Sequence, residues 1–459
     1  MNKKLFIIIV LSFFVRLISL NQTLWLDEAT TAQVARHLSF LQIVTQFSPF
    51  DFHPPTFYLL EKFWGSIFGF SEISLRMPSV IFSLATGFVI YKIVRKFESS
   101  KVSIVAAVLF LFNPLIIYYS QEARMYMMTT FLLTTGLYYF FNYSSSDKSR
   151  ITDIELQKYK RSSLMMMNLF FGLAFLTFYG SAFLIATIFL YILIKKQYKS
   201  FFICIFSAFA YFLVVSPLLY HQLLNSRSAL AEVKNWTAVL GKAYLKNLLL
   251  IPIKFSIGRI DFYPKWLYYG IAGSWTTFVF ISTFLFGAEP KKTLLKYLFI
   301  FPLVLGFLVS FVTPLLQYFR FIYLIPIMAI LLAIQTVGSA QSTPRRWALV
   351  LGFATFSFIY LLFPQFHRED WKNLVKSLPQ REPVYMVLSS SDPVKYYDDS
   401  LKLHNLENLK NADTRQLIVI PYTADIHGID YRATLAEKRY SLVKEKAFNQ
   451  LLVEYWKKN

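Results

Sequence analysis

The sequence predicts an all-α polytopic membrane protein with about 11 transmembrane helices, a large first external loop with interfacial helices, and a small external α/β domain at the carboxyl end. The chain has 459 residues, of which 56% are hydrophobic and only 16% are charged, which is too apolar for an ordinary soluble protein. Its apolar residues form many stretches long enough, or nearly so, to cross ~30 Å of hydrocarbon as a helix. The composition becomes mixed and polar after Phe366.

Eleven apolar stretches are predicted to span the membrane, because each approaches the length that a helix needs for one crossing. In chain order they are Leu5 to Leu20, Pro78 to Val94, Val102 to Tyr119, Met125 to Phe141, Ser163 to Phe178, Ala182 to Ile194, Phe201 to Leu219, Trp266 to Phe286, Leu294 to Thr313, Phe321 to Val337 and Trp347 to Phe363.

Basic residues orient these spans. If the amino terminus is cytoplasmic, the cytoplasmic segments hold 19 basic and five acidic residues, and this bias fixes the direction of insertion. Of the 47 basic and 26 acidic residues, 32 and 13 precede residue 366, so the spanning part carries +19 and the rest +2. The excess is topological and indicates no nucleic-acid partner. We predict a multi-pass protein of the plasma membrane with an extracytoplasmic carboxyl-terminal domain.

Two domains are predicted, a transmembrane domain over residues 1–365 and an extracytoplasmic α/β domain over residues 366–459. Within the second domain, Val384 to Leu388 and Leu417 to Ile420 have the pattern of buried strands, and Leu442 to Trp456 has that of an amphipathic helix. The lone Cys204 lies inside a predicted span, which excludes an internal disulfide.

The first external loop, from Asn21 to Met77, is too long and too patterned for a simple connector. Ala29 to Gln46 reads as one amphipathic helix. A second helix carries an apolar stripe from Phe57 to Phe68 and stops at Gly69. We expect both helices to lie flat on the outer interface, and Pro54-Pro55 to start the second one.

The same loop carries the candidate chemistry. Asp27 and Glu28 follow the first span by a few residues, and His53 lies further along the loop. A carboxylate just outside a span is well placed to deprotonate a hydroxyl against a lipid-borne substrate.

Several runs together resemble the protein-mannosyltransferase-like branch of the C-superfamily glycosyltransferases, which includes the aminoarabinose and galacturonic acid transferases of bacterial envelopes. The runs that carry the resemblance are Leu24-Trp25-Leu26-Asp27-Glu28, His53-Pro54-Pro55-Thr56-Phe57-Tyr58-Leu59-Leu60, Ser71-Glu72 with Leu75-Arg76-Met77-Pro78-Ser79, Ser120-Gln121-Glu122-Ala123-Arg124-Met125-Tyr126, Arg320-Phe321-Ile322-Tyr323-Leu324-Ile325-Pro326, and Glu369-Asp370-Trp371. The ordered match covers the first ~140 residues, whereas Ser144 to Thr313 matches only in hydropathy.

This resemblance implies transfer of a single sugar, with inversion, from a polyprenyl-phosphate carrier to an acceptor hydroxyl on the outer face. The acceptor is a glycolipid, a glycan or a protein. By position, Asp27 matches the family's catalytic carboxylate, Glu28 its neighbour, and Glu122 the acidic residue of the second external loop. Because a carrier phosphate leaves easily, one base suffices, unlike the acid and base pair of glycoside hydrolysis. No Asp-x-Asp motif occurs in the first external loop, so no cofactor is expected to be obligatory, and a divalent metal remains open.

The carrier phosphate and the acceptor need binding groups at the outer interface, and arginine suits phosphate because its planar fork binds two oxygens. The substrate-binding candidates are His53, Lys62, Arg76, Arg124, Tyr126, Arg259 and Arg320.

Each candidate also has a simpler interpretation. Asp27 is suited to cap the helix that follows it, and Glu122 with Arg124 to close the turn between two spans as an ion pair. The basic side chains are long enough to reach lipid headgroups from helix ends.

Two rival functions remain at the level of sequence. One is a transporter or flippase for lipid carriers or glycolipids, which is expected to place ionisable residues or broken helices at mid-membrane. The predicted spans are free of charge at their middles, and the candidate residues gather at one face, which favours surface chemistry. The other rival is a non-catalytic relative that only binds the carrier lipid.

Overall fold

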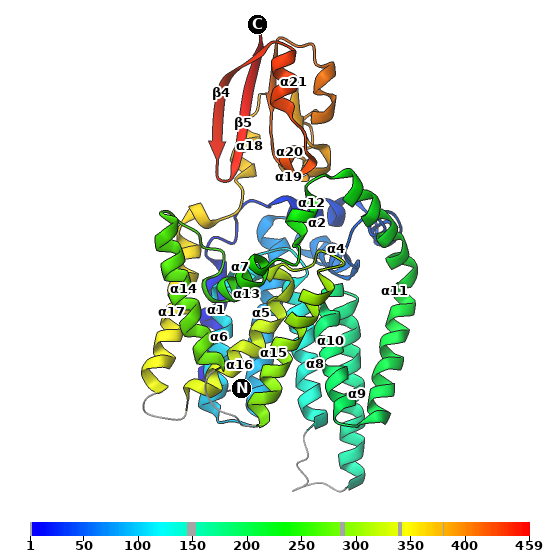
Figure 1. Ribbon diagram of the computed structural model, residues 1–459, viewed down its shortest axis with the longest axis vertical. Helices are drawn as coiled ribbons and strands as arrows, with labels where there is room; N and C mark the ends of the chain where they lie inside the picture. The colour runs from blue at the N-terminus through cyan, green and yellow to red at the C-terminus, as the bar shows by residue number, and fades with distance from the viewer. Residues whose placement is uncertain (1, 145–152, 285–289, 338–341, 380) are drawn as a thin grey trace.

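The computed structural model describes residues 2–144, 153–284, 290–337, 342–379 and 381–459. A tall body of helices carries a smaller, sheet-containing carboxyl-terminal domain on one end (Figure 1). The amino terminus lies near the opposite end of the body, and the carboxyl terminus lies at the far tip of the small domain (Figure 1).

Each of the eleven predicted spans overlaps a helix of the body. These helices are α1 (Lys3–Leu17), α5 (Glu72–Val94), α6 (Ser100–Leu111), α7 (Pro114–Ser120), α8 (Tyr126–Ser144), α9 (Asp153–Phe175), α10 (Ala182–Ile194), α11 (Tyr198–Glu232), α14 (Lys265–Phe284), α15 (Pro290–Val309), α16 (Ile325–Thr336) and α17 (Ser342–Leu362). Shorter helices join them, namely η2 (Tyr179–Ser181), α12 (Trp236–Leu240), α13 (Leu245–Ile257) and η3 (Tyr318–Leu324).

A multi-pass helical membrane protein is confirmed, but the number of 11 spans is not. By length and composition, five helical segments in the described ranges are able to cross a membrane, and α6 with α7, bent by 60°, would make a sixth. The end of the predicted eighth span at Phe286, and the loop residues 145–152 with Lys148 and Arg150, lie outside the described residues.

The bend between α6 and α7 has a local cause at Asn113. The side-chain oxygen of Asn113 accepts hydrogen bonds from the backbone N–H groups of Leu115 and Ile116, and its amide donates to the carbonyl of Phe255 at 2.8 Å. Pro114 follows and has no N–H to continue the preceding helix. The new direction brings the end of α7 to the turn that carries Glu122.

The segment predicted as the first external loop, residues 21–77, folds as α2 (Leu26–His37), α3 (Phe40–Gln42), the π-helical turn η1 (Ile43–Phe47) and α4 (Thr56–Phe68). The single helix predicted over Ala29 to Gln46 is wrong, because a capping box starts a new turn at Ser39. The Ser39 hydroxyl accepts from the backbone N–H of Gln42, and the Gln42 side chain accepts from that of Ser39. The second helix is confirmed and ends at Gly69, whose φ is +80°.

The small domain is an α/β fold, as predicted. Its sheet has the strand order β2-β1-β3-β5-β4, with β1 parallel to β2 and β3, and with β5 antiparallel to β3 and β4. Its elements are η4 (Pro364–Phe366), α18 (Trp371–Lys376), β1 (Val384–Met386), η5 (Leu388–Ser390), α19 (Asp392–Tyr397), β2 (Leu403–Asn405), η6 (Leu406–Asn411), β3 (Gln416–Val419), α20 (Ala424–His427), α21 (Tyr431–Glu437), β4 (Tyr440–Phe448) and β5 (Leu451–Lys458). The predicted strands at Val384 and Leu417 are confirmed as β1 and β3.

The amphipathic helix predicted over Leu442 to Trp456 is wrong, since this segment forms the β4–β5 hairpin. Asn449 and Gln450 make the two-residue turn, with φ of +60° at Gln450. Asn449 was the available signal for this turn, because asparagine is a common turn residue.

The small domain rests on the first external loop through α19 and α2. Thr30 donates to the carboxylate of Asp392 at 2.6 Å, and the backbone N–H of Leu24 donates to the hydroxyl of Tyr397 at 3.0 Å. Tyr396 donates to the carbonyl of Phe70 at 2.7 Å. These bonds fix the position of α2 relative to the domain above it.

The predicted orientation is testable by cysteine labelling. Lys101 and Ser400 are both exposed, and they lie on opposite sides of the membrane if the basic segments are cytoplasmic. In intact cells, an impermeant maleimide is expected to label Ser400→Cys and to spare Lys101→Cys, and lysis is expected to expose the second site. The buried Cys204 keeps the background low. Labelling of residue 101 but not 400 in intact cells would reverse the topology.

Candidate active site

The carboxylates and arginines predicted from the sequence converge at the end of the body that carries the small domain. Asp27 and Glu28 lie in the first turn of α2, and Arg76 lies near the start of α5. Glu122 and Arg124 lie in the turn between α7 and α8. The hydroxyl of Ser79 donates to the carbonyls of Glu122 and Arg124, at 2.6 and 3.4 Å, which fixes this turn on α5.

Glu28 is fully buried and saturated with donors. Its two oxygens accept from Arg76 at 2.8 and 2.6 Å, from the backbone N–H of Ala123 at 2.8 Å, and from Arg368 at 3.0 Å. Burial raises the pKa of Glu28, but the two guanidinium groups outweigh burial and hold that pKa below its usual range. Glu28 is therefore a charged carboxylate with its oxygens already in use.

Arg76 also has no free donor, because all five of its N–H groups have acceptors. Apart from the fork on Glu28, it donates to the carbonyls of Leu20, Gln22 and Thr23 at 2.8, 2.6 and 3.0 Å. The arginine thus ties the chain that leaves the first predicted span to the base of α2.

Glu122 is buried but only half satisfied. One of its oxygens accepts from Arg368 at 2.9 Å, and the other has no hydrogen-bond partner among the described residues. Burial raises the pKa of Glu122 to about 7, although Arg368 opposes this rise and Glu28 adds to it. A carboxyl group with this pKa exchanges its proton near neutral pH.

Asp27 differs sharply from its neighbour. Its side chain is 39% exposed, and its nearest cation is Arg124, with Nη2 3.7 Å from Oδ2. Arg124 in turn donates to the hydroxyls of Tyr58 at 2.9 Å and Thr31 at 3.4 Å. Asp27 is the accessible carboxylate of the pair, held at one side by a buried guanidinium group.

A second chain of contacts runs from Arg124 toward His53. The Tyr58 hydroxyl donates to Asp51 at 2.8 Å, and Nδ1 of His53 lies 3.6 Å from the same carboxylate. Burial opposes ionisation of Asp51, yet His53, Arg124 and Tyr58 lower its pKa to about 2. His53 therefore lies next to a carboxylate that remains charged at neutral pH.

The other predicted cations surround the same region but have weaker partners. Arg259 is exposed, donates to the hydroxyl of Tyr118 at 2.6 Å, and lies 4.8 Å from the centre of its ring. Arg320 donates to the carbonyls of Leu240 and Pro314, both at 3.1 Å, and Lys62 donates to that of Ala35 at 3.3 Å. Their hydrogen-bond acceptors are neutral hydroxyl and carbonyl groups, so the positive charge of each side chain can still attract an anion.

Tyr126 lies within the same group of side chains. Its ring packs against Tyr119, Phe178 and Phe319, with ring centres 5.1, 6.2 and 5.7 Å apart. The aromatic wall joins the start of α8 to η3, which carries Arg320.

Sequence reasoning missed two residues of this site. Arg368 lies in the connector between η4 and α18, directly before the run Glu369-Asp370-Trp371, which was the available signal. Glu61 on α4 is fully buried, and neither of its carboxyl oxygens has a hydrogen-bond partner among the described residues. Burial, with a smaller effect from Glu28, raises the pKa of Glu61 well above its usual range.

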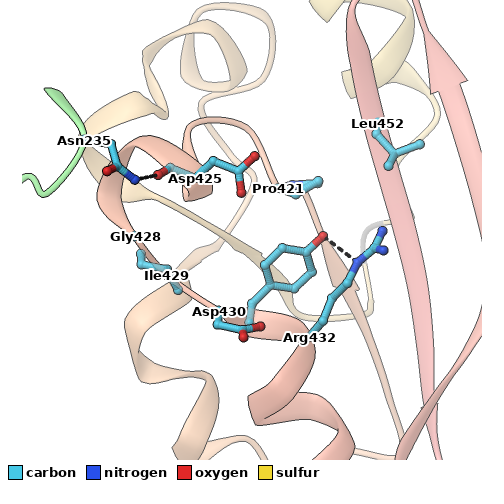
Figure 2. Close-up of a pocket in the computed structure, with 9 residues that line it drawn as sticks. Asn235, Pro421, Asp425, Gly428, Ile429, Asp430, Arg432 and Leu452 are labelled. Atoms are coloured by element: carbon cyan, nitrogen blue, oxygen red, sulfur yellow. Dashed lines mark hydrogen bonds between the residues drawn. The ribbon is translucent and has the colours of Figure 1, made fainter. Parts of the chain in front are cut away.

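A cavity of about 730 Å³ lies elsewhere, in the small domain near Asn235. Figure 2 shows Asp425, Asp430 and Arg432 around it, and the amide of Asn235 donates to the carbonyl of Asp425 at 2.7 Å. None of the predicted site residues lines it. Within the described ranges, no group of three or more His, Cys, Asp or Glu side chains is arranged to hold a metal.

Comparison with known proteins gives one family match and a shared fold. Residues 52–221 match the family described as dolichyl-phosphate-mannose-protein mannosyltransferase. No curated protein sequence matches the chain.

Solved structures share the fold at low sequence identity. ArnT from Cupriavidus metallidurans in the apo state has a TM-score of 0.60 and 12% identity, with 98% of this chain and 97% of that chain covered. The same protein bound to undecaprenyl phosphate has a TM-score of 0.58 and 12% identity over the same shares. The oligosaccharyltransferase AglB from Archaeoglobus fulgidus, with an inhibitory peptide and a dolichol-phosphate, has a TM-score of 0.53 and 11% identity, with 96% and 73% covered. The family match supports the resemblance to mannosyltransferase-like enzymes over residues 52–221, and the solved structures show a shared fold.

Proposed function

We propose that this chain is an integral-membrane, inverting glycosyltransferase that moves a single sugar from a polyprenyl-phosphate carrier to an acceptor hydroxyl on the outer face of the membrane. Asp27 carries this proposal, because it is the accessible member of a carboxylate pair whose other member, Glu28, is consumed by four hydrogen bonds. The fold shared with ArnT supports a lipid-linked donor, since that protein was solved with undecaprenyl phosphate.

In the proposed reaction, the carboxylate of Asp27 takes the proton of the acceptor hydroxyl as the hydroxyl oxygen attacks the anomeric carbon. The bond from that carbon to the carrier phosphate breaks, and the phosphate leaves with the electron pair. Attack opposite the leaving group inverts the anomeric configuration. One base is sufficient, because a phosphate leaves without the protonation that an alcohol needs.

The remaining predicted residues take separate proposed roles. Glu28 and Arg76 anchor the start of α2 and thereby orient Asp27, while Glu122 is the second carboxylate of the site. Arg124 positions Asp27. Tyr58 accepts a hydrogen bond from Arg124 and, like His53, contacts Asp51. Arg259, Lys62 and Arg320 bind the carrier phosphate, because their hydrogen-bond acceptors are neutral. Tyr126 forms part of the wall that faces the sugar.

The function is tested with purified protein and polyprenyl-phosphate-linked hexoses and pentoses that carry a labelled sugar. Transfer of label to membrane glycolipid, glycan or protein, with release of polyprenyl phosphate, is expected for at least one donor. Nuclear magnetic resonance of the product is expected to show the opposite anomeric configuration. Binding of carrier without transfer or hydrolysis of any donor would instead support the non-catalytic alternative.

Arg259 offers a direct test of phosphate binding. Loss of a charge-assisted bond to phosphate costs on the order of 1.5–3 kcal/mol, so Arg259→Ala is expected to raise the KM for the carrier-linked sugar about tenfold or more. The matched control is Arg227→Ala, which removes another exposed arginine, from α11. Equal KM values for the two variants would assign the phosphate to Lys62 or Arg320.

A further inference from the structure

One side chain from the carboxyl-terminal segment joins the two external loops. Arg368 donates through Nε to Glu28 at 3.0 Å and through Nη2 to Glu122 at 2.9 Å. Its side chain is 1% exposed, and its guanidinium carbon lies 4.3 Å from the centre of the Tyr118 ring. Within the described residues, Nη1 has no hydrogen-bond partner. The carboxylates of the first and second loops therefore share one arginine.

Two arginines and two carboxyl groups make up this buried group. Arg76 and Arg368 supply two positive charges, and Glu28 and Glu122 are the carboxylates that face them. Removal of one partner from a buried pair leaves an uncompensated charge, which is far more costly than the pair itself is stabilising. Without Arg368, the carboxylates of Glu28 and Glu122 would face each other with one cation fewer.

The connector that carries Arg368 is held by the β4–β5 turn. The side-chain amide of Asn449 donates to the carbonyls of Pro364 at 3.2 Å, His367 at 3.2 Å and Arg368 at 2.9 Å. The amide of Gln450 donates to the carbonyl of His367 at 2.8 Å, and the N–H of Asp370 donates to the carbonyl of Asn449 at 3.1 Å. Figure 1 shows this turn at the lower end of the hairpin, next to the connector.

We propose that Arg368 is a positioning residue for the transfer reaction and that the β4–β5 turn, through Asn449, holds it in place, so that docking of the small domain aligns the two external loops. The catalytic part of this inference rests on the proposed function. The geometric part is that Asn449 holds Arg368 and that Arg368 contacts Glu28 and Glu122. It depends only on the hydrogen bonds described above.

Glu122 reports the position of Arg368, because its protonation depends on that charge. The groups that face Glu122 are Arg368, Glu28, Arg259 and Arg124. The three arginines favour the charged carboxylate, and Glu28 disfavours it. Loss or displacement of Arg368 raises the pKa of Glu122 and lowers the ionised fraction at a given pH. As the pH falls, any activity that needs ionised Glu122 is then lost at a higher pH than in the wild type.

The first measurement is an infrared titration of the Glu122 carboxyl band, assigned by its absence in Glu122→Gln. Arg368→Gln is expected to move the midpoint upward by about one pH unit or more, whereas Arg368→Lys, which keeps the charge, moves it less. Asn449→Ala is expected to move it in the same direction as Arg368→Gln. The matched control is Asn405→Ala at the opposite edge of the sheet. It removes an amide whose side-chain bonds, among the described residues, are to Glu407, and it is expected to leave the midpoint unchanged.

The second measurement is transfer kinetics of the same variants. Arg368→Gln is expected to lower kcat about a hundredfold with little change in KM for the donor, Arg368→Lys to restore part of the loss, and Asn449→Ala to lower kcat about tenfold relative to Asn405→Ala. An unmoved midpoint in Arg368→Gln, or identical behaviour of Asn449→Ala and Asn405→Ala, would overturn the inference. If the wild type transfers no sugar from any donor, the proposed function is wrong. The geometric inference is then still tested by the infrared titration, which needs no transfer activity.

Discussion

Replacement of Asp27 with asparagine is expected to lower the transfer rate by about 10² to 10⁴, while the protein still inserts and binds carrier lipid. Asparagine keeps the shape of the side chain but lacks the basicity that the acceptor proton requires. Arg124 retains its bonds to Tyr58 and Thr31 in this variant, so the site keeps most of its contacts. The measurement is turnover of purified Asp27→Asn, with carrier-lipid binding as the folding control.

The same variant separates catalysis from helix capping. Asparagine caps a helix about as well as aspartate, so a purely structural Asp27 predicts nearly unchanged activity. The structure adds that Trp25, outside the helix, occupies the cap position and that Asp27 lies within the first turn. Activity within about threefold of the wild type would remove Asp27 as the base.

Glu28→Gln is expected to fail for a different reason, namely loss of stability. The substitution leaves two buried guanidinium groups with one carboxylate fewer, and breaking a buried ion pair typically costs about 3–5 kcal/mol. We therefore expect a clear fall in thermal stability and weaker carrier binding together with lost activity. Unfolding of the detergent-solubilised protein, followed by intrinsic tryptophan fluorescence, measures this effect.

A control for Glu28 is available at Glu61, on the neighbouring helix α4. Burial raises the pKa of Glu61, and neither of its carboxyl oxygens has a hydrogen-bond partner among the described residues, so Glu61→Gln breaks no ion pair or hydrogen bond found there and is expected to change stability little. A stable, fully bound but inactive Glu28→Gln protein would contradict the anchoring role and would assign the base to Glu28.

Local sequence patterns predicted those helix ends that depend on neighbouring residues in the sequence. The helix Ala182–Ile194 has the predicted bounds, because a run of apolar residues ends at the charged pair Lys195-Lys196. The end of α4 at Gly69 followed from the freedom of glycine to adopt positive φ. The hairpin at Asn449 was missed, because apolar residues at its two strands fit a helical spacing until the turn is recognised.

The site was predicted only in part, because partners distant in sequence leave no local trace. Asp27, Glu28, Glu122 and Arg124 come together as the motifs implied. Arg76 was interpreted as a phosphate ligand, yet the contacts of its five N–H groups depend on the path of residues 20–23, which periodicity does not reveal. Arg368 carried no motif of its own, and its distance from Glu28 is visible only in three dimensions.

Glu28 and Arg368 are 340 residues apart, and this separation sets an order of events during synthesis. Glu28 therefore leaves the ribosome 340 residues before Arg368, which follows the last predicted span. Until Arg368 is synthesised, Glu28 and Glu122 lack the guanidinium group that they share in the folded protein. Pairing of Arg368 with both carboxyl groups is therefore a late step of assembly, and a nascent chain that stops short of residue 368 is expected to be recognised by membrane quality control.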